Sequence, residues 1–331
     1  MLYALLIYAI FVFILLLGIK FRPLTKEKDF FSSFNRLRGF FALEIVVGHV
    51  VRYESSLLYP IGKFMIISVA FFFFVSAYGM VRSYYTKDDY LHGFLFSKFS
   101  YLLAIAVIAY LHSLIINFLF TGSIEPKHII RGFFTSTNWY IWELLFFYLL
   151  FFLIYRYIPK YRVSIVSGLT FFLATGGFFI GLPQCYYCSA MAFPAGLLFY
   201  EHFDTVTRFL KTIWGKLTTV IMTVAGLYSL FLGEDSLLGM VYLRNLICLA
   251  FLLLLIYFIS YFEVSNKILT CLGKYSTEIY LYQFVFLLLT EGQLTYQIRI
   301  PVVVAFTFLS ALVLHPLNTR VKQKLKNLVF L

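Results

Sequence analysis

Long hydrophobic runs separated by short polar segments recur along the whole chain. Eleven of these runs are each close to the ~20 residues that a helix needs to cross a bilayer. The first run has no basic start and no small-residue cleavage site, so we expect a retained helix rather than a signal peptide. This pattern predicts an all-α fold, a polytopic transmembrane bundle of about eleven spans. The runs cover residues 2–19, 36–51, 61–81, 99–120, 139–157, 163–181, 187–201, 217–232, 245–262, 276–291 and 299–316.

The composition agrees with a membrane protein built as one domain. Of the 331 residues, 62% are hydrophobic and only 13% are charged. Soluble domains of this size contain fewer apolar and more charged residues. No polar stretch is long enough to fold separately, so we expect residues 1–331 to form a single integral membrane domain.

The basic residues are divided unevenly between the two alternating sets of loops. One set holds 21 of the 27 Lys and Arg residues, and the other holds six, namely Arg52, Lys63, Lys127, Arg131, Arg244 and Arg299. Loops rich in Lys and Arg face the cytoplasm, so we expect the N-terminus outside and the C-terminus inside. This topology also accounts for the net charge of +12, and we expect no nucleic-acid partner. The basic tail at 317–331 is expected to lie on the anionic inner surface of the lipid bilayer.

Arg38 and His49 are the most informative polar residues, because they lie eleven positions apart in an apolar segment. At about 100° per residue they return to within about 20° of one helical face, about 16 Å apart along the axis. A charged or titratable side chain near the bilayer centre costs roughly 2.5–3.5 kcal/mol, so it usually faces a cavity or a pathway. Arginine can hold phosphate, and histidine can move a proton near neutral pH. We therefore expect one polar cleft with an anion-binding group at one end and a base at the other.

Simpler interpretations of these residues stand beside the functional one. His49 could be a packing histidine that is hydrogen-bonded to a backbone carbonyl. Arg38 could mark the inner boundary of its helix, as basic residues often do. Glu44 lies about 140° from His49 around the helix, so we expect it to pair with another helix rather than to orient the base.

The cysteines and the other histidines are expected to have no chemical role. Cys185 and Cys188 form a C-x-x-C in a short turn without a second ligand pair, so we expect no metal site. Small apolar filler is the expected role of such thiols, and a disulfide is the alternative. No role is assigned to His92, His112, His128, His202 and His315.

Five short motifs stand in order along the chain. They are Arg38-Gly39 through His49, the aromatic run Phe71 to Gly79, the segment Trp139 to Tyr148, the helix start Ala192 to Gly196, and the late stretch Leu272 to Leu281. In this order and with these separations they are similar to motifs of the acyltransferase-3 family of integral membrane acyltransferases. The resemblance covers residues from about 33 to 316. It implies a ten-helix core at 33–316, an extra N-terminal helix at 2–19 and the tail at 317–331.

The chain departs from the family pattern at three places. An Asp often precedes the Arg-Gly pair, where Asn35 or Arg36 stands here. The family's Ser-Gly is Ser76 followed by Ala77, and the late motif has Gln283 where His is common. Arg38 and His49 are intact, so the resemblance still implies the activity class.

The resemblance implies transfer of an acyl group, commonly acetyl, from acyl-CoA to a hydroxyl of a cell-surface glycan or a lipid-linked sugar. Acyl-CoA would be a co-substrate, and we expect no cofactor and no metal. The expected location is the plasma (inner) membrane of a bacterium. The alternative is a transporter that moves an anionic or acylated solute through the same cleft. Transporters often contain inverted repeats or paired broken helices, and the sequence shows no repeat.

The expected roles follow from the needs of acyl transfer. Arg38, with Arg36, would hold the donor phosphates by forked hydrogen bonds. His49 would be the general base that removes the acceptor's proton. The oxyanion formed in the reaction needs hydrogen-bond donors. We expect these donors, or groups that support them, among Ser76, Tyr78, Trp139 and Glu143.

Overall fold

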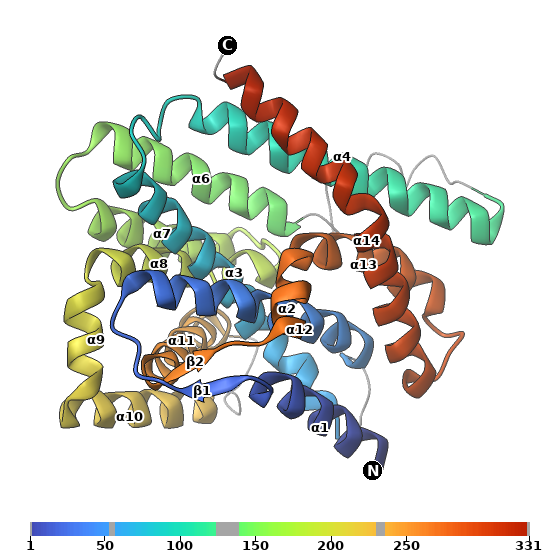
Figure 1. The fold of residues 1–331 in the computed structure, drawn as a ribbon, viewed down its shortest axis with the longest axis horizontal. Helices are drawn as coiled ribbons and strands as arrows, with labels where there is room; N and C mark the ends of the chain where they lie inside the picture. The colour runs from blue at the N-terminus through green and yellow to red at the C-terminus, as the bar shows by residue number, and fades with distance from the viewer. Residues whose placement is uncertain (1, 53–56, 124–138, 230–235, 330–331) are drawn as a thin grey trace.

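The computed structural model describes residues 2–52, 57–123, 139–229 and 236–329, and these form a bundle of helices (Figure 1). The predicted all-α fold is confirmed. The N-terminal half contains α1 (Leu2–Leu16), α2 (Glu27–Val51), α3 (Tyr59–Thr86), α4 (Phe94–Thr121), α6 (Trp139–Tyr157) and α7 (Arg162–Phe179). The C-terminal half contains η1 (Gln184–Tyr186), α8 (Ala192–Glu201), α9 (Phe203–Lys211), α10 (Ile213–Ser229), η2 (Leu238–Leu243), α11 (Arg244–Tyr261), α12 (Lys267–Lys274), α13 (Ser276–Thr290) and α14 (Tyr296–Val329).

Within the described residues, every predicted apolar run overlaps a helix. Six helical segments among the described residues are both long and apolar enough to cross a membrane. They are α3, α4, α6, α7, the continuous segment Leu238–Tyr261, and α14 as far as Leu325. The number of about eleven spans stays a prediction, because the other runs form shorter or less apolar helices.

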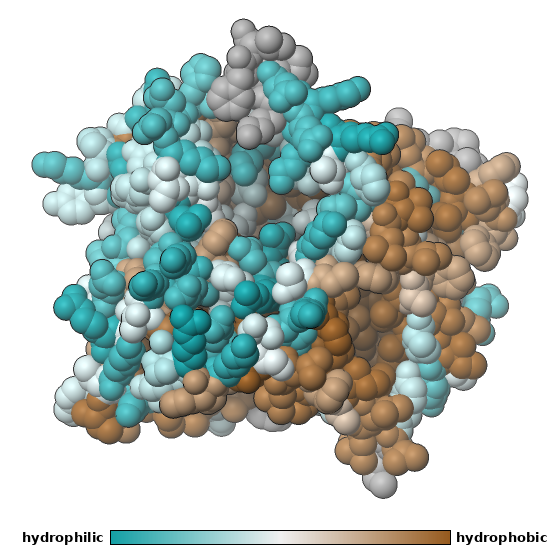
Figure 2. All heavy atoms as spheres, in the orientation of Figure 1, coloured by the Kyte–Doolittle hydropathy of each residue, from teal (hydrophilic) through white to brown (hydrophobic). Residues whose placement is uncertain are grey.

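Hydrophobic side chains cover one flank of the bundle. Figure 2 shows them at the right, over the end that carries α4, α13 and α14 in Figure 1, while hydrophilic side chains cover the left and centre of this face. Large apolar residues of α4 and α14 are well exposed, among them Leu119, Phe120, Leu309 and Val313. An exposed apolar surface of this extent is typical of contact with lipid.

Several helix boundaries differ from the sequence prediction. Helix α2 begins at Glu27 rather than at residue 36, and the helix predicted at 187–201 begins only at Ala192. The segment predicted as a tail at 317–331 continues α14, which passes through Pro316 and runs to Val329. Its position on the surface of the bilayer stays a prediction. The tail is rich in Leu and Lys, which are good helix formers. It therefore extends the helix and carries Lys322 over the Tyr101 ring of α4, with the ammonium 5.4 Å from the ring centre.

A short two-stranded ribbon, which the sequence did not predict, joins two helix connections. Strand β1 (Ile19–Phe21) pairs antiparallel with β2 (Phe262–Val264), and Ile19 lies opposite Val264. Directly after β2, the Asn266 side chain accepts hydrogen bonds from the backbone N–H groups of Ile268 and Leu269 and so caps α12. The ribbon therefore fixes α12 next to the first half of α2.

Helices α2 and α12 approach closely beside Arg38. A Cβ atom added at Gly39 would lie 2.6 Å from the backbone nitrogen of Gly273 and 2.7 Å from the carbonyl oxygen of Leu269. Only glycine fits between these backbones, which explains why a glycine follows Arg38. This contact sets how far α12 lies from the face of α2 that carries Arg38.

An aromatic core holds the other side of α2. The Phe34 ring contacts the rings of Phe71, Phe74 and Tyr78 on α3, and that of Phe199 on α8, with ring centres 5.4 to 6.3 Å apart. All five rings are almost fully buried. Edge-to-face contacts of this kind add to the free energy gained by burial. Helix α2 is thus held rigidly between α12 and the pair formed by α3 and α8.

We expect Gly39→Ala to lower the free energy of unfolding by about 1–3 kcal/mol, because the added methyl group overpacks the contact with α12. Gly168→Ala is the matched control, since a Cβ there meets no described atom within 4 Å. In a helix, alanine is more stable than glycine by roughly 0.5–1 kcal/mol, so the control should be neutral or stabilising. Thermal unfolding of both proteins in detergent measures the difference, and equal midpoints would contradict the packing argument.

Candidate functional site

Two cavities meet on the face of α2 that carries Arg38 and His49. The Arg38 cavity has a volume of about 480 Å³, and the His49 cavity has a volume of about 560 Å³. They share three lining residues, Ile45, Val69 and Tyr280, which are at most 7% exposed. We call these three residues the partition.

The expected single cleft is therefore two chambers with a largely apolar partition between them. The reason lies in the same helical periodicity that aligned the polar pair. Ile45 is seven residues after Arg38 and four residues before His49, so it shares their face of α2. An apolar side chain thus lies on the path between the two polar groups.

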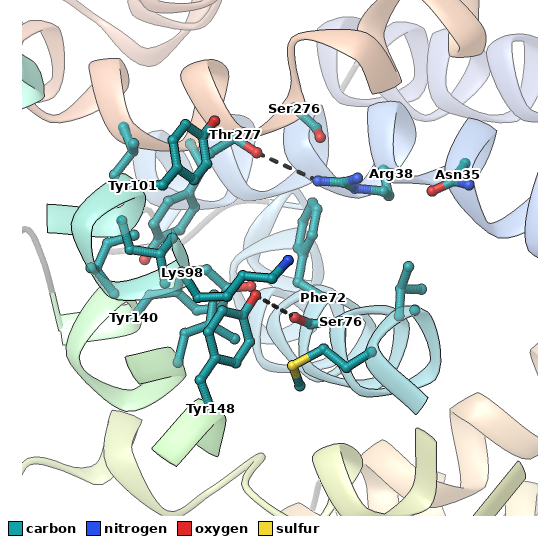
Figure 3. Close-up of a pocket in the computed structure, with 18 of the residues that line it drawn as sticks. Asn35, Arg38, Phe72, Ser76, Lys98, Tyr101, Tyr140, Tyr148, Ser276 and Thr277 are labelled. Carbon is teal, nitrogen blue, oxygen red and sulfur yellow. Dashed lines mark hydrogen bonds between the residues drawn. The ribbon is translucent and has the colours of Figure 1, made fainter. Parts of the chain in front are cut away.

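The Arg38 cavity is lined by three cations from three helices. Arg38 donates a hydrogen bond of 3.4 Å from Nη2 to Thr277 Oγ1 on α13. Lys98 from α4 and Lys322 from α14 line the same cavity, and the nitrogen atoms of Arg38 and Lys98 point into the same space in Figure 3. No Asp or Glu is among its described lining residues. The cavity is therefore suited to an anion.

A more polar chamber adjoins the Arg38 cavity and shares Arg38, Thr277 and Lys322 with it. This chamber, which we call the Arg36 basin, has a volume of about 570 Å³ and is also lined by Arg36, Lys274, Glu278 and His315. Arg36 is already engaged, since Nη1 donates to the carbonyl oxygen of Val264 and lies 3.8 Å from a carboxylate oxygen of Glu263. The structure thus shows a structural contact of Arg36 with β2, and its expected binding of acyl-CoA stays a prediction.

His315 lines the Arg36 basin, although no role was expected for it from the sequence. His315 Nδ1 lies 2.8 Å from Glu278 Oε1, and the same oxygen accepts a hydrogen bond of 3.3 Å from Asn318. The only acidic residue among the described lining residues of the basin is thus held by two neighbours on α14. The sequence alone did not reveal this contact, because His315 and Glu278 are 37 residues apart.

His49 has both a structural contact and access to a cavity. Its Nδ1 lies 2.8 Å from the carbonyl oxygen of Ile45, and its ring packs edge-on against Phe284 with centres 5.5 Å apart. The backbone contact is the one that the packing interpretation expected. A carbonyl acceptor fixes the proton on Nδ1, however, and leaves Nε2 as an acceptor. The structural contact is therefore compatible with a base at Nε2, and the catalytic role of His49 stays a prediction.

The remaining predicted residues have different surroundings. Ser76 lines the Arg38 cavity, and its Oγ lies 3.0 Å from the hydroxyl oxygen of Tyr148 (Figure 3). Trp139 lines the His49 cavity. Tyr78 lines none of the three chambers, and its hydroxyl donates to Glu27 Oε1 at 2.7 Å. Glu143 is buried, lines none of them, and neither of its oxygens has a hydrogen-bond partner among the described residues.

Two other groups near the site bear on the sequence analysis. The Ser68 hydroxyl donates to Glu44 Oε2 at 2.5 Å, so the expected pairing of Glu44 with another helix is present. Cys185 and Cys188 are free thiols that line the His49 cavity. The turn that carries them is therefore part of the chamber wall.

Tyr280 is a residue at the centre of the site that sequence reasoning noted only as part of a motif. Its ring packs against that of Tyr140 with centres 5.0 Å apart, and it is 5% exposed. Its hydroxyl has no hydrogen-bond partner among the described residues. A buried hydroxyl without a partner is costly, so this group at the partition is suited to bind a ligand oxygen.

Comparison with known proteins identifies one family. A sequence model of the acyltransferase-3 family, described as an acyltransferase domain, matches residues 31–315 of the 331-residue chain. The matched segment runs from the first half of α2 into α14 and contains all of the residues that form the partition. No curated protein and no solved structure matches the chain significantly.

Proposed function

We propose that this chain, which belongs to the acyltransferase-3 family of membrane acyltransferases, transfers an acyl group from acyl-CoA to a hydroxyl of a glycan or a lipid-linked sugar. The acyl group is acetyl, and the membrane is the inner membrane of a bacterium. The observation that carries the proposal is the arrangement of Arg38 and His49 in separate cavities that meet at one partition. This arrangement suits two substrates that approach one reaction point from opposite directions.

The donor enters through the Arg36 basin and the Arg38 cavity. Acyl-CoA carries several phosphates, and Arg38, Lys98 and Lys322 surround one anion-binding space. Arginine binds phosphate through two parallel hydrogen bonds, and lysine binds it as a point charge. The basin lies on the side of the bundle with the larger number of basic loops, which is the cytoplasmic side by the positive-inside rule. Acyl-CoA is available on that side.

The acceptor enters through the His49 cavity. His49 Nε2 removes the proton from the acceptor hydroxyl, and the hydroxyl oxygen attacks the thioester carbonyl carbon. The tetrahedral intermediate then collapses and the carbon–sulfur bond breaks. CoA leaves as the thiolate and takes up one proton, so the products are the ester and free CoA.

The reaction point lies at the partition. Tyr280 lines both cavities, and in this proposal its hydroxyl donates a hydrogen bond to the carbonyl oxygen as negative charge develops on it. Among the donors expected from the sequence, the Ser76 hydroxyl already contacts Tyr148 and the Tyr78 hydroxyl already donates to Glu27. Tyr280 is therefore a better placed donor than Ser76 or Tyr78.

We expect His49→Ala and Arg38→Ala to affect different kinetic constants. Loss of the base should lower kcat by about 10²–10⁴ with little change in the KM for acyl-CoA. Loss of the guanidinium should raise that KM by about tenfold or more, because hydrogen bonds to charged groups contribute roughly 1.5–3 kcal/mol. Steady-state kinetics of the purified enzyme with acetyl-CoA separates the two effects.

The control for this experiment is His112→Ala. His112 is also in a helix, contacts Ser310, and lines none of the three chambers. It should keep most of the activity. An equal loss in the His49 and His112 variants would contradict the base assignment, and acceptor movement without any CoA-dependent product would favour the transporter.

We expect Tyr280→Phe to lower kcat by about 10²–10³, the usual effect of removing one oxyanion donor, without raising the KM for acyl-CoA. Tyr282→Phe is the matched control, because its hydroxyl accepts a hydrogen bond from Asn318 at 2.9 Å and lines none of the chambers. The measurement is again kcat and KM with acetyl-CoA. Wild-type kcat in the Tyr280 variant would refute its role.

A further inference from the structure

The side of the bundle opposite the Arg36 basin is poor in basic residues, yet three of the basic residues described there line one cavity. Only six of the 27 Lys and Arg residues belong to this set of loops. Four of the six are described, and three of these, Arg52, Lys63 and Arg244, line the His49 cavity. The fourth, Arg299, donates to the carbonyl oxygen of Leu287 at 2.8 Å and so supports the end of α13.

These three cations come from separate parts of the chain. Arg52 directly follows α2, Lys63 lies in the first half of α3, and Arg244 begins α11. The positive-inside rule explains why this side has few basic residues. It does not explain why three of them, from three elements, line one chamber. Their convergence is thus a property of the cavity.

The charge of the lining is not balanced by acidic residues within it. No Asp or Glu is among the described residues that line the His49 cavity. Glu143 is an acid close to it, but its oxygens are buried and it does not line the chamber. The three cations also contact protein groups, as Lys63 does with the Tyr59 ring at 5.2 Å. The described lining therefore carries a net positive charge, and low-dielectric walls extend the field of that charge across the chamber.

We propose that the His49 cavity takes an acidic sugar, one that carries a carboxylate or a phosphate close to the hydroxyl that is acylated. This inference rests on the proposed function and narrows its acceptor. The volume of about 560 Å³ is in the range of small-ligand sites. Arg52 and Arg244 can hold the anionic group by charge-assisted hydrogen bonds. The hydroxyl beside that group then lies at His49.

The charge of the cavity can be measured through Cys185, a partly buried thiol in its wall. In a protein whose other cysteines are replaced by serine, we compare the modification rates by anionic and cationic methanethiosulfonates. Burial raises the pKa of the Cys185 thiol to about 11, which slows both reactions equally. We expect the anionic reagent to be favoured at least about tenfold relative to a free thiol in solution.

Charge-neutralising variants test the source of this preference. Lys63→Gln and Arg244→Gln should each lower the ratio of anionic to cationic rates several-fold. Lys216→Gln, on exposed α10 and outside the cavity lining, should leave it unchanged. A wild-type ratio equal to that of a free thiol, or one that favours the cation, would overturn the proposal.

Protection of Cys185 from a neutral methanethiosulfonate tests ligand binding itself. Methyl glucuronide and glucose 6-phosphate carry the carboxylate and the phosphate, and methyl glucoside is the neutral control. We expect an acidic sugar to protect at a concentration at least about tenfold lower than the neutral one, and Arg244→Gln to remove this difference. Equal protection by all three sugars, or protection by none of them, would overturn the proposal.

A further experiment determines whether the cations of the cavity bind an acidic sugar or the headgroup of an anionic lipid. In nanodiscs of phosphatidylcholine the acidic sugars should protect Cys185, and phosphatidylglycerol should add no protection of its own. Protection by the anionic lipid alone would assign the cations to a lipid headgroup and overturn the proposal. Neither thiol readout requires acyl transfer, so a failure here is distinct from a failure of the His49→Ala experiment.

Discussion

The whole arrangement depends on one apolar helix face that carries two polar side chains. Arg38 and His49 lie on the same side of α2, about 16 Å apart along its axis. Because ionisable groups are costly inside a bilayer, the surrounding helices must supply polar space at two depths. The close contact of Gly39 with α12, and the aromatic contacts of Phe34 on the other side, hold α2 where both groups open into chambers.

The partition determines the surroundings in which the contents of the two chambers meet. A continuous polar channel would let water and ions pass, whereas Ile45 and Val69 keep the meeting point of the two chambers apolar. Exclusion of water strengthens electrostatic interactions with the reacting atoms. The hydroxyl of Tyr280 has no protein partner among the described residues. In the proposed reaction, a thioester from one side and a hydroxyl from the other would meet beside this hydroxyl.

The helices, the polar pair on α2 and the family could be predicted from the sequence, because apolar runs and motif spacings are local patterns. The groups that complete the site could not be predicted from the sequence. Lys98 and Lys322 lie more than 200 residues apart and meet only because α14 continues past Pro316. A strand of three residues is too short to show an alternating pattern in the sequence. Ile45 is one of many apolar residues in its helix, so nothing in the sequence distinguishes it as a residue between the two chambers.

The central claim is that donor and acceptor approach the partition from opposite sides of the membrane. The most direct test measures acyl transfer in proteoliposomes with acetyl-CoA supplied on only one side of the membrane. The orientation of the protein is determined with a membrane-impermeant thiol reagent, which reacts with exposed Cys271 on α12, beside the Arg36 basin. Acetyl-CoA supplied only on the Cys271 side should support transfer to an acceptor on the other side. Equal transfer with acetyl-CoA supplied on either side would contradict the account.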